Sequence, residues 1–495
     1  MRLHSFVSRG FSGDCITVEA DLRKGFPGFD LVGLPDSAIR ESRERVRSAL
    51  RNSGIPIPRK RVLINLAPAS MHKAGSQLDL AIALVIALSQ KISDGEIQIA
   101  NDLPVMVVGE LALDGTVIAI QNVQGALAAA KQKGCLATIA PVQDGLLPSD
   151  TLMLVTSLSD AVKKVQQHLL GDDFRKLRAG EIQISHVIDK LPFADVEGLE
   201  SVRRALEVAA AGGHHVLLFG SPGAGKTLCA TSFSSLLPPA QELLYEEMAR
   251  IRSALGSLDP LIRGERPACI LPQVSLKEDF SFYAARSHGG VMIVDEISTF
   301  PKSILEQLRE VYDRRRVYLK MDKRISEFPA RFQIIATMNA CPCGELGIED
   351  GRCSCSQVTI MRYWKKLGSG LLDRFDIRIP VDPQQESEIV SFPFDLECAF
   401  DRQKFRFSNE DFPIMQNADL MHYPQARVHH IDAQVIEMAK SILDGSTSMR
   451  GVFSVCTVAR TIADLLDQDL IGEQEIRIAS MLRRYGSYDF YWRSY

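Results

Sequence analysis

The sequence predicts a multidomain α/β protein, and three features of its 495 residues lead to this fold class. In residues 1–168, strand-like runs alternate with helical runs, which is typical of an α/β domain. A glycine-rich loop at 220–227 follows an apolar strand and opens a helix, which predicts an α/β/α core that binds phosphate. From 432 to about 485 the pattern is helical and predicts a C-terminal lid of helices.

The composition limits the kind of partner and the compartment. A net charge of −4 and a pI of about 6.2 give no overall basic field, so contacts with nucleic acid must come from local patches. The first 11 residues lack the apolar run of a signal peptide. The longest apolar segment, 78–88, contains Asp79 and is too short to span a bilayer. We therefore expect a cytoplasmic protein with no membrane partner.

The first predicted domain, residues 1–168, has strand-like runs at 16–19, 62–66, 105–111 and 116–120 and helical runs at 37–53, 78–89 and 123–133. The first helix carries arginines that offer a basic face to DNA: Arg40, Arg43, Arg45, Arg47 and Arg51. Glu41 and Glu44 lie between them, so a solvated, self-paired face is an equal alternative. Residues 169–190 are charged and weakly periodic, and we expect a linker.

The core, predicted at 191–385, begins with a complete P-loop after the apolar strand 215–219. Its glycines let backbone N–H groups close around phosphates. We expect Lys226 to reach the β- and γ-phosphates of ATP and the Thr227 hydroxyl to bind Mg²⁺. The residues expected to contact the nucleotide here are Gly220, Ser221, Pro222, Gly223, Ala224, Gly225, Lys226, Thr227 and Leu228.

Two further apolar strands end in polar residues. The strand 291–294 is followed by Asp295, which we expect to hold Mg²⁺, and by Glu296, which is placed to polarise the attacking water as a general base. An exposed carboxylate pair is the alternative, but a pair that directly follows an apolar strand favours a site. Asn339 ends the strand 332–338, and we expect it between the other two strands as a polar sensor of the γ-phosphate.

Four of the ten cysteines form two pairs, Cys341 with Cys343 and Cys353 with Cys355. In a reducing compartment such pairs indicate a metal site rather than disulfides, and four thiolates match structural zinc. Their spacing is tighter than usual, and reduced thiols in a loop are the alternative. A zinc ion here would brace the strand that carries Asn339.

Residues 313–324 read as a basic hairpin before that strand. Alternation puts Arg316, Tyr318 and Lys320 on one face, a combination that suits contact with DNA phosphates and stacking on bases. An edge hairpin whose charges block aggregation is the alternative. Residues 386–430 are expected to be an irregular connection, and 431–495 to form the lid.

These motifs resemble the AAA+ ATPases of the magnesium-chelatase-like branch, and more closely the ComM/YifB family. The stretches 32–47, 193–198, 209–214 and 339–344 carry the closer resemblance. It implies a homo-hexameric ring that moves on DNA as a helicase. Such a motor drives branch migration while incoming DNA is recombined in natural transformation. It also implies that Arg374 is an arginine finger for the neighbouring subunit and that Arg460 is a second sensor of the nucleotide. Surface ion pairs are the alternative for both arginines.

Residues 1–168 resemble the fold of Lon protease, but the catalytic dyad of that family is missing. Alignment of 72–77 with its serine loop puts Gln77 at the nucleophile, and alignment of 109–125 puts Gln124 at the lysine. An amide serves neither role, so we expect no peptidase activity. Ser76 and Lys73 lie one position off on the same loop. The domain is expected to build the ring or engage DNA.

The chain departs from the family at 266–273, where an aromatic residue and paired histidines are usual, and in the shortened insertion 276–288. Such insertions line the pore in related rings. The departure leaves the ATPase motifs intact and keeps a second function open, which is a chelatase-like motor that remodels a protein partner. A nucleotide switch that rarely hydrolyses ATP is disfavoured by the intact Asp295, Glu296 and Arg374.

Overall fold

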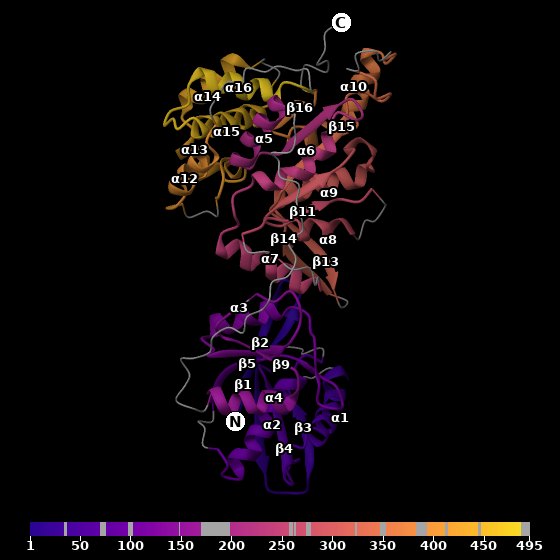
Figure 1. Cartoon of the computed structure of the whole chain (residues 1–495), viewed down its shortest axis with the longest axis vertical. Helices are drawn as coiled ribbons and strands as arrows, with labels where there is room; N and C mark the ends of the chain where they lie inside the picture. The colour runs from indigo at the N-terminus through magenta and orange to yellow at the C-terminus, as the bar shows by residue number, and fades with distance from the viewer. Residues whose placement is uncertain are drawn as a thin grey trace. The chain divides into compact units, whose positions relative to one another are not determined.

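The computed structural model describes residues 1–33, 37–69, 76–97, 102–147, 149–169, 199–256, 261, 264–273, 279–321, 324–346, 353–382, 394–410, 414–443 and 447–486 (Figure 1). The chain divides into two compact units. Unit 1 comprises Met1–Val187, Glu242–Arg263 and Tyr318–Phe328. Unit 2 comprises Ile188–Gln241, Gly264–Val317 and Pro329–Tyr495.

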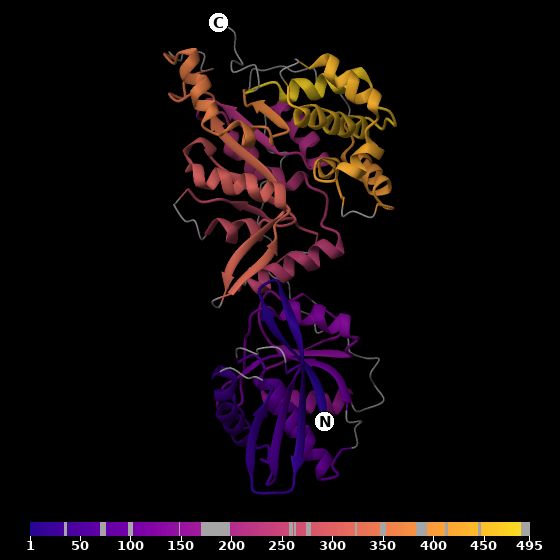
Figure 2. The same ribbon diagram turned by 180° about the vertical axis from the view of Figure 1, so that it is seen from behind.

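Unit 1 is built on a mixed seven-stranded sheet of order β3-β4-β2-β1-β5-β8-β9. Its strands are β1 (Arg2–Arg9), β2 (Ser12–Arg23), β3 (Gly28–Val32), β4 (Arg61–Ala67), β5 (Asp102–Val107), β8 (Ala137–Pro141) and β9 (Leu152–Val155). A small ladder pairs β6 (Glu110–Leu111) with β7 (Val117–Ile118). The helices of this region are α1 (Ser37–Asn52), α2 (Asp79–Ser93), α3 (Val123–Lys133), α4 (Leu158–Lys164) and the π-helix η1 (Val165–Leu169). The expected α/β character is confirmed, and Figure 2 shows the sheet from behind.

Alternation along the strands gives the sheet two apolar faces. Val105 and Val107 join a core with the almost fully buried helix α2. Met106 joins a second core with α3. The face of α1 is less basic than its sequence suggested, because Arg45 pairs with the fully buried Asp79 at 2.8 Å.

Unit 2 holds a parallel five-stranded sheet of order β11-β12-β15-β10-β16. These strands are β11 (Ala268–Ile270), β12 (Val291–Val294), β15 (Gln333–Asn339), β10 (Val216–Gly220) and β16 (Ile377–Pro380). Around them lie α5 (Glu200–Gly212), α6 (Lys226–Ser232), η4 (Phe233–Leu236), α8 (Asp279–Arg286), η5 (Ile297–Thr299), α9 (Lys302–Arg314), α10 (Gln357–Lys365) and α11 (Ser369–Leu372). Strands buried on both faces explain the continuous apolar runs of the sequence.

The C-terminal helices of unit 2 are α12 (Leu396–Arg406), η7 (Asn417–Met421), α13 (Pro424–His430), α14 (Ala433–Ile442), α15 (Met449–Leu465) and α16 (Glu473–Arg483). Helix α15 is buried almost throughout and packs on α5. We call α12 to α16 the lid.

Part of the segment 386–430 is helical, which corrects the expectation of an irregular connection. Helix α12 buries only Ala399 and Gln403, so its apolar periodicity is weak in the sequence. Gln403 is held by hydrogen bonds to the carbonyls of Ala211 and Ala399, and Asp395 caps the helix. The expected linker, 169–190, lies outside the described residues except for Leu169.

Two elements from the middle of the sequence belong to unit 1, although the segments on either side of them in the chain belong to unit 2. They are α7 (Glu242–Ala254) and most of the hairpin formed by β13 (Arg316–Met321) and β14 (Arg324–Pro329). Within the described part of the chain, no helix has the length and apolar character needed to cross a membrane.

Candidate nucleotide-binding site and cysteine cluster

The P-loop connects β10 to α6 by a turn that requires glycine. Gly223 and Gly225 have φ angles of +79° and +92°, a region that residues with side chains rarely adopt. Lys226 begins α6 and folds back over the loop, where its Nζ donates to the carbonyls of Gly220 at 3.2 Å and Ser221 at 2.7 Å. Burial lowers the pKa of Lys226, while Asp295 and Glu296 oppose this effect. The ammonium therefore lies beside two carboxylates at the expected phosphate site.

The residues expected to hold Mg²⁺ are brought together. The Thr227 hydroxyl donates to Oδ1 of Asp295 at 3.0 Å. The Thr337 hydroxyl donates to the same oxygen at 2.6 Å, and the backbone N–H of Glu296 donates to Thr337 Oγ1 at 2.9 Å. Hydroxyl and carboxylate oxygens are the ligand types that Mg²⁺ prefers, so this pair fits the ion.

Sequence reasoning missed Thr337, although a signal was present. It lies two residues before Asn339, and alternate residues of a strand face the same side. A threonine in an otherwise apolar strand, on the face of Asn339, could have been assigned to the site. It orients both members of the Asp295–Glu296 pair.

Glu296 follows β12 with a φ of +51°, which is uncommon for a residue with a side chain. The side chain is exposed, as a base that contacts a water molecule requires. Asn339 ends β15, which lies between β12 and β10, and is paired in register with Gly220. The structure thus brings Asn339 beside the start of the P-loop.

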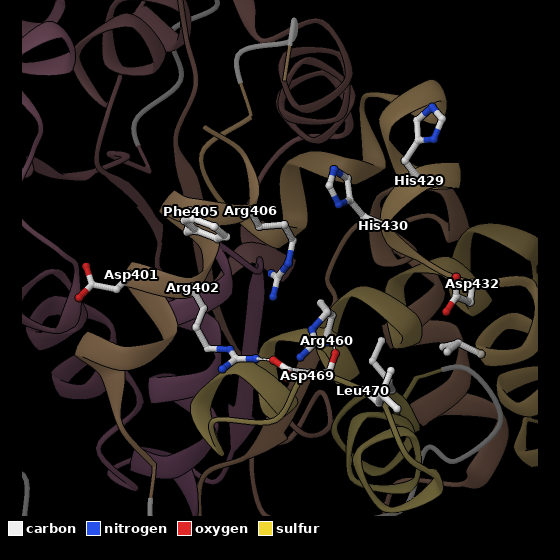
Figure 3. A pocket seen from close by; sticks show the side chains of 12 residues that line it. Asp401, Arg402, Phe405, Arg406, His429, His430, Asp432, Arg460, Asp469 and Leu470 are labelled. Atoms are coloured by element: carbon white, nitrogen blue, oxygen red, sulfur yellow. Dashed lines mark hydrogen bonds and ion pairs between the residues drawn. The ribbon is translucent and has the colours of Figure 1, made fainter. Parts of the chain in front are cut away.

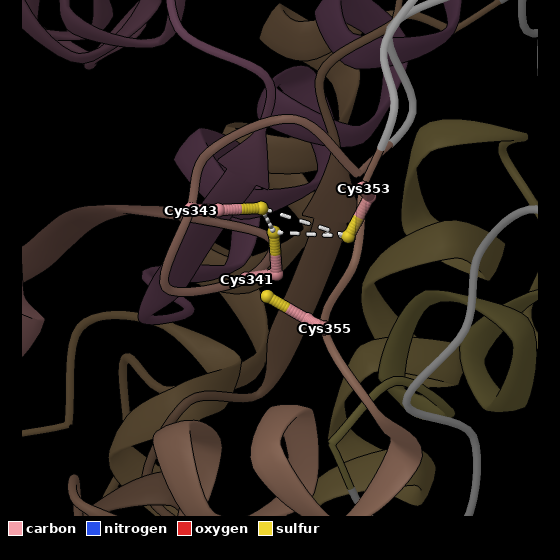
Figure 4. Close-up of side chains that lie close together, drawn as sticks. All are labelled: Cys341, Cys343, Cys353 and Cys355. Carbon is pink, nitrogen blue, oxygen red and sulfur yellow. Dashed lines mark hydrogen bonds between the residues drawn. The ribbon is translucent and has the colours of Figure 1, made fainter.

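The four paired cysteines converge, as Figure 4 shows, and all their Sγ atoms lie within 4.8 Å of one another. Three of the separations are 3.2, 3.6 and 3.7 Å. Zinc–sulfur bonds of about 2.3 Å in a tetrahedron place sulfurs about 3.8 Å apart, so the cluster fits zinc. No disulfide joins these cysteines among the described residues.

The cysteine cluster is attached to the nucleotide site at two points. Gly344 packs on the P-loop, because a Cβ built there would lie 3.1 Å from Cγ of Pro222. The Trp364 indole donates to the carbonyl of Ala340 at 3.1 Å, next to Asn339.

Arg374 follows α11, and its side chain is held within its own subunit against the C-terminal end of α9. It forms a bidentate ion pair with Asp313 and donates to the carbonyl of Gly370. Its guanidinium also lies 5.6 Å from the centre of the Tyr312 ring.

Arg460 is not placed with the P-loop residues. It is 6% exposed and donates to Asp464 and to the carbonyls of Gln468 and Asp469, all in the lid. It lines a cavity of about 600 Å³ together with Arg402 and Arg406, and no P-loop residue lines this cavity (Figure 3). These contacts hold the Arg460 side chain within the lid.

Arg450 is a second arginine that sequence reasoning missed. It lies in the first turn of α15, and its guanidinium is 5.0 Å from the centre of the same Tyr312 ring that Arg374 contacts. Its buried Nε has no hydrogen-bond partner within the part of the chain that the structure describes.

In the unit 1 domain, the hydroxyl of Ser76 donates to Glu110, while Gln124 is buried at the start of α3. Lys73 lies outside the described residues.

The strand order, the P-loop and the lid define the magnesium-chelatase-like class of AAA+ proteins. The family "Subunit ChlI of Mg-chelatase" matches residues 18–144, "Magnesium chelatase, subunit ChlI" matches 192–272 and 282–389, and "Magnesium chelatase, subunit ChlI C-terminal" matches 395–483.

Similar proteins cover almost the whole chain. A protein of Mycobacterium tuberculosis (strain ATCC 25618 / H37Rv) is 32% identical, with 98% of this chain and 99% of that protein aligned. YifB of Escherichia coli (strain K12) is 30% identical, with 97% and 96% aligned. The competence protein ComM of Haemophilus influenzae (strain ATCC 51907 / DSM 11121 / KW20 / Rd) is 29% identical, with 96% and 94% aligned. The chain belongs to the ComM/YifB family.

Proposed function

We propose that this protein is an ATPase motor that works as a homo-hexameric ring and uses ATP hydrolysis to move on DNA. The observation that supports ATPase activity is that Lys226, Thr227 and Asp295 lie together, beside Glu296. The DNA substrate rests on family membership and on the exposed basic hairpin. The task that suits such a motor is helicase action or branch migration during recombination of incoming DNA, as in natural transformation.

Each residue of the site has a distinct role in hydrolysis. Lys226 holds the β- and γ-phosphates, and Thr227 with Asp295 holds Mg²⁺. When bound, Mg²⁺ neutralises charge on the phosphate oxygens. Glu296 takes a proton from the attacking water, and Asn339 orients the γ-phosphate.

The arginines complete the site of a neighbouring subunit. Arg374 and Arg450 meet at one ring, so they are suited to act together on one γ-phosphate. We assign the role of second nucleotide-sensing arginine to Arg450 in place of Arg460. The side chain of Arg460 is hydrogen-bonded to Asp464 and to the carbonyl of Asp469, within the lid.

Zinc is proposed as a structural ion of the Cys341, Cys343, Cys353 and Cys355 cluster. Its task is to fix the loop that packs against Pro222 and follows Asn339.

The DNA contact is proposed for the hairpin β13–β14. Arg316, Tyr318 and Lys320 are exposed on one face of β13. Cations there can meet phosphates, and the Tyr318 ring can stack on a base.

A motor that remodels a protein partner is the second candidate. The observation that favours it is β11, where Ala268–Ile270 replaces the usual aromatic residue and histidines and Ile270 is 52% exposed.

The test is ATP turnover with and without single-stranded and forked DNA. The Arg316→Ala/Lys320→Ala double variant should lose the stimulation by DNA and keep basal turnover. The matched control, Lys440→Ala/Arg477→Ala, removes two exposed charges from the lid and should keep both. Turnover that ignores DNA would refute a DNA motor and favour a protein partner.

A further inference from the structure

The segment that carries Arg374 is bonded to the lid at several points. Ser448 donates to Oδ2 of Asp373 at 2.9 Å. Arg483 donates to the carbonyls of Phe375 at 2.6 Å and of Asp373 at 2.9 Å. Residues 373–375 therefore move with α15 and α16, and Arg450 lies in the first turn of α15.

Tyr312 lies where this lid-bound segment meets the core. Its ring centre is 4.7 Å from that of His215 in the core and 4.9 Å from that of His422 in the lid. The guanidiniums of Arg374 and Arg450 contact the same ring. Tyr312 is 6% exposed, so the contacts are protected from water.

We propose that Tyr312 is a positioning residue, an aromatic platform that sets the two guanidiniums at a fixed separation so that they act as one unit. This inference rests on the proposed function of Arg374 and Arg450 in a neighbouring subunit's site. Tyr312 itself touches neither nucleotide nor DNA in the proposal.

Two features of the geometry favour positioning over simple packing. The bidentate pair with Asp313 fixes the plane of the Arg374 guanidinium. The Tyr312 ring then restricts movement of that guanidinium on one side. Among the described residues the buried Nε of Arg450 has no hydrogen-bond partner, and its guanidinium meets Tyr312 through both the hydroxyl and the ring. Two long side chains lose their reach to a shared phosphate when such a support is removed.

The platform is tested by replacing the ring in the full-length protein. Tyr312→Phe keeps the ring and removes only the hydroxyl that is bonded to Arg450; because the ring is the platform, it should turn over ATP within about twofold of wild type. Tyr312→Leu removes the ring and should lose turnover by about a hundredfold or more, a loss that arginine fingers commonly account for. Binding of a fluorescent ATP analogue should be unchanged in both, because each subunit's own P-loop is intact.

Mixed rings separate positioning from a folding defect. Tyr312→Leu subunits keep an intact Glu296, whereas Glu296→Gln subunits keep intact arginines. Mixing the two should restore turnover at interfaces where a Glu296→Gln subunit donates its arginines to a Tyr312→Leu site. A mixture of Arg374→Ala with Glu296→Gln is the reference.

The outcomes are distinct. If the reference mixture recovers turnover and the Tyr312→Leu mixture does not, the platform is wrong. If neither recovers, the donation of arginines between subunits is wrong, and the proposed ring mechanism fails first. Full turnover by Tyr312→Leu alone would also overturn the platform.

A second measurement holds even where Tyr312→Leu fails to fold. Arg374→Ala, Arg450→Ala and the double variant leave the ring in place. If the arginines act as one unit, the double variant should lose no more turnover than the worse single variant. If the fold-losses in turnover of the two single variants multiply in the double variant, the two arginines act independently and the proposal is overturned.

Discussion

Thr337 shows how one hydroxyl can organise two carboxylates. It donates to Asp295 and accepts from the backbone of Glu296. We expect Thr337→Val, which keeps the shape and removes the hydroxyl, to leave two polar groups unsatisfied. A cost of about 1–3 kcal/mol in the active geometry corresponds to a loss of turnover of roughly 5- to 150-fold. Thr337→Ser should retain turnover, and a Val variant with wild-type turnover at saturating Mg²⁺ would contradict the role.

Residues within short motifs could be predicted from the sequence, whereas residues recruited from elsewhere could not. Lys226 and Thr227 are set by the spacing of the P-loop itself. Arg450 belongs with Arg374 only because the start of α15 and the segment after α11 both reach Tyr312, which no local pattern records. The resemblance assigns Arg460 to the nucleotide, and the structure shows it bonded within the lid, to Asp464 one turn along α15 and to the carbonyls of Gln468 and Asp469.

The lid illustrates how elements are joined by buried charge. Arg402, Arg406 and Arg460 converge on Asp464, which is fully buried on α15. Asp464→Asn removes the shared counter-charge, and we expect it to lower the free energy of unfolding by about 3 kcal/mol. Urea denaturation measures this. The control Asp467→Asn removes an exposed partner of Arg402 and should cost under about 1 kcal/mol. Equal effects of the two variants would show that burial at Asp464 is unimportant.

The cysteine loop couples a metal to the P-loop through packing. Purified protein should contain one zinc per chain, and Cys343→Ser should lose it, whereas Cys398→Ser, outside the cluster, should keep it. Because Gly344 packs on Pro222, loss of zinc should lower both the melting temperature and the affinity for ATP. Metal analysis and titration with an ATP analogue measure the two effects. Zinc loss that leaves ATP affinity unchanged would contradict the coupling.

The fold of each unit followed from the periods of its apolar residues, but the order of its strands did not. The nearly continuous apolar run of β5 predicts a strand with two covered faces, and continuous runs in β12 and β15 predict central parallel strands. Neither pattern by itself states that β15 lies between β12 and β10; the order of the nucleotide motifs leads to that expectation, and the strand pairing confirms it. That order depends on the crossing helices, and it brings Thr337 to Asp295 and Asn339 to Gly220.

At the level of the assembled protein, turnover at a site that needs arginines from a neighbouring subunit must depend on protein concentration. Arg374 is paired with Asp313 in its own subunit, so an isolated subunit lacks a donor for its own γ-phosphate. We expect turnover per subunit to fall as the protein is diluted through the assembly range, while ATP binding per subunit stays constant. Arg374→Ala should turn over ATP about 10³-fold more slowly than the assembled wild type, and dilution should not lower its turnover further. Sedimentation measured in the same buffer locates the assembly range. Turnover per subunit that stays constant while the ring dissociates would show that the arginine acts within its own chain or not at all.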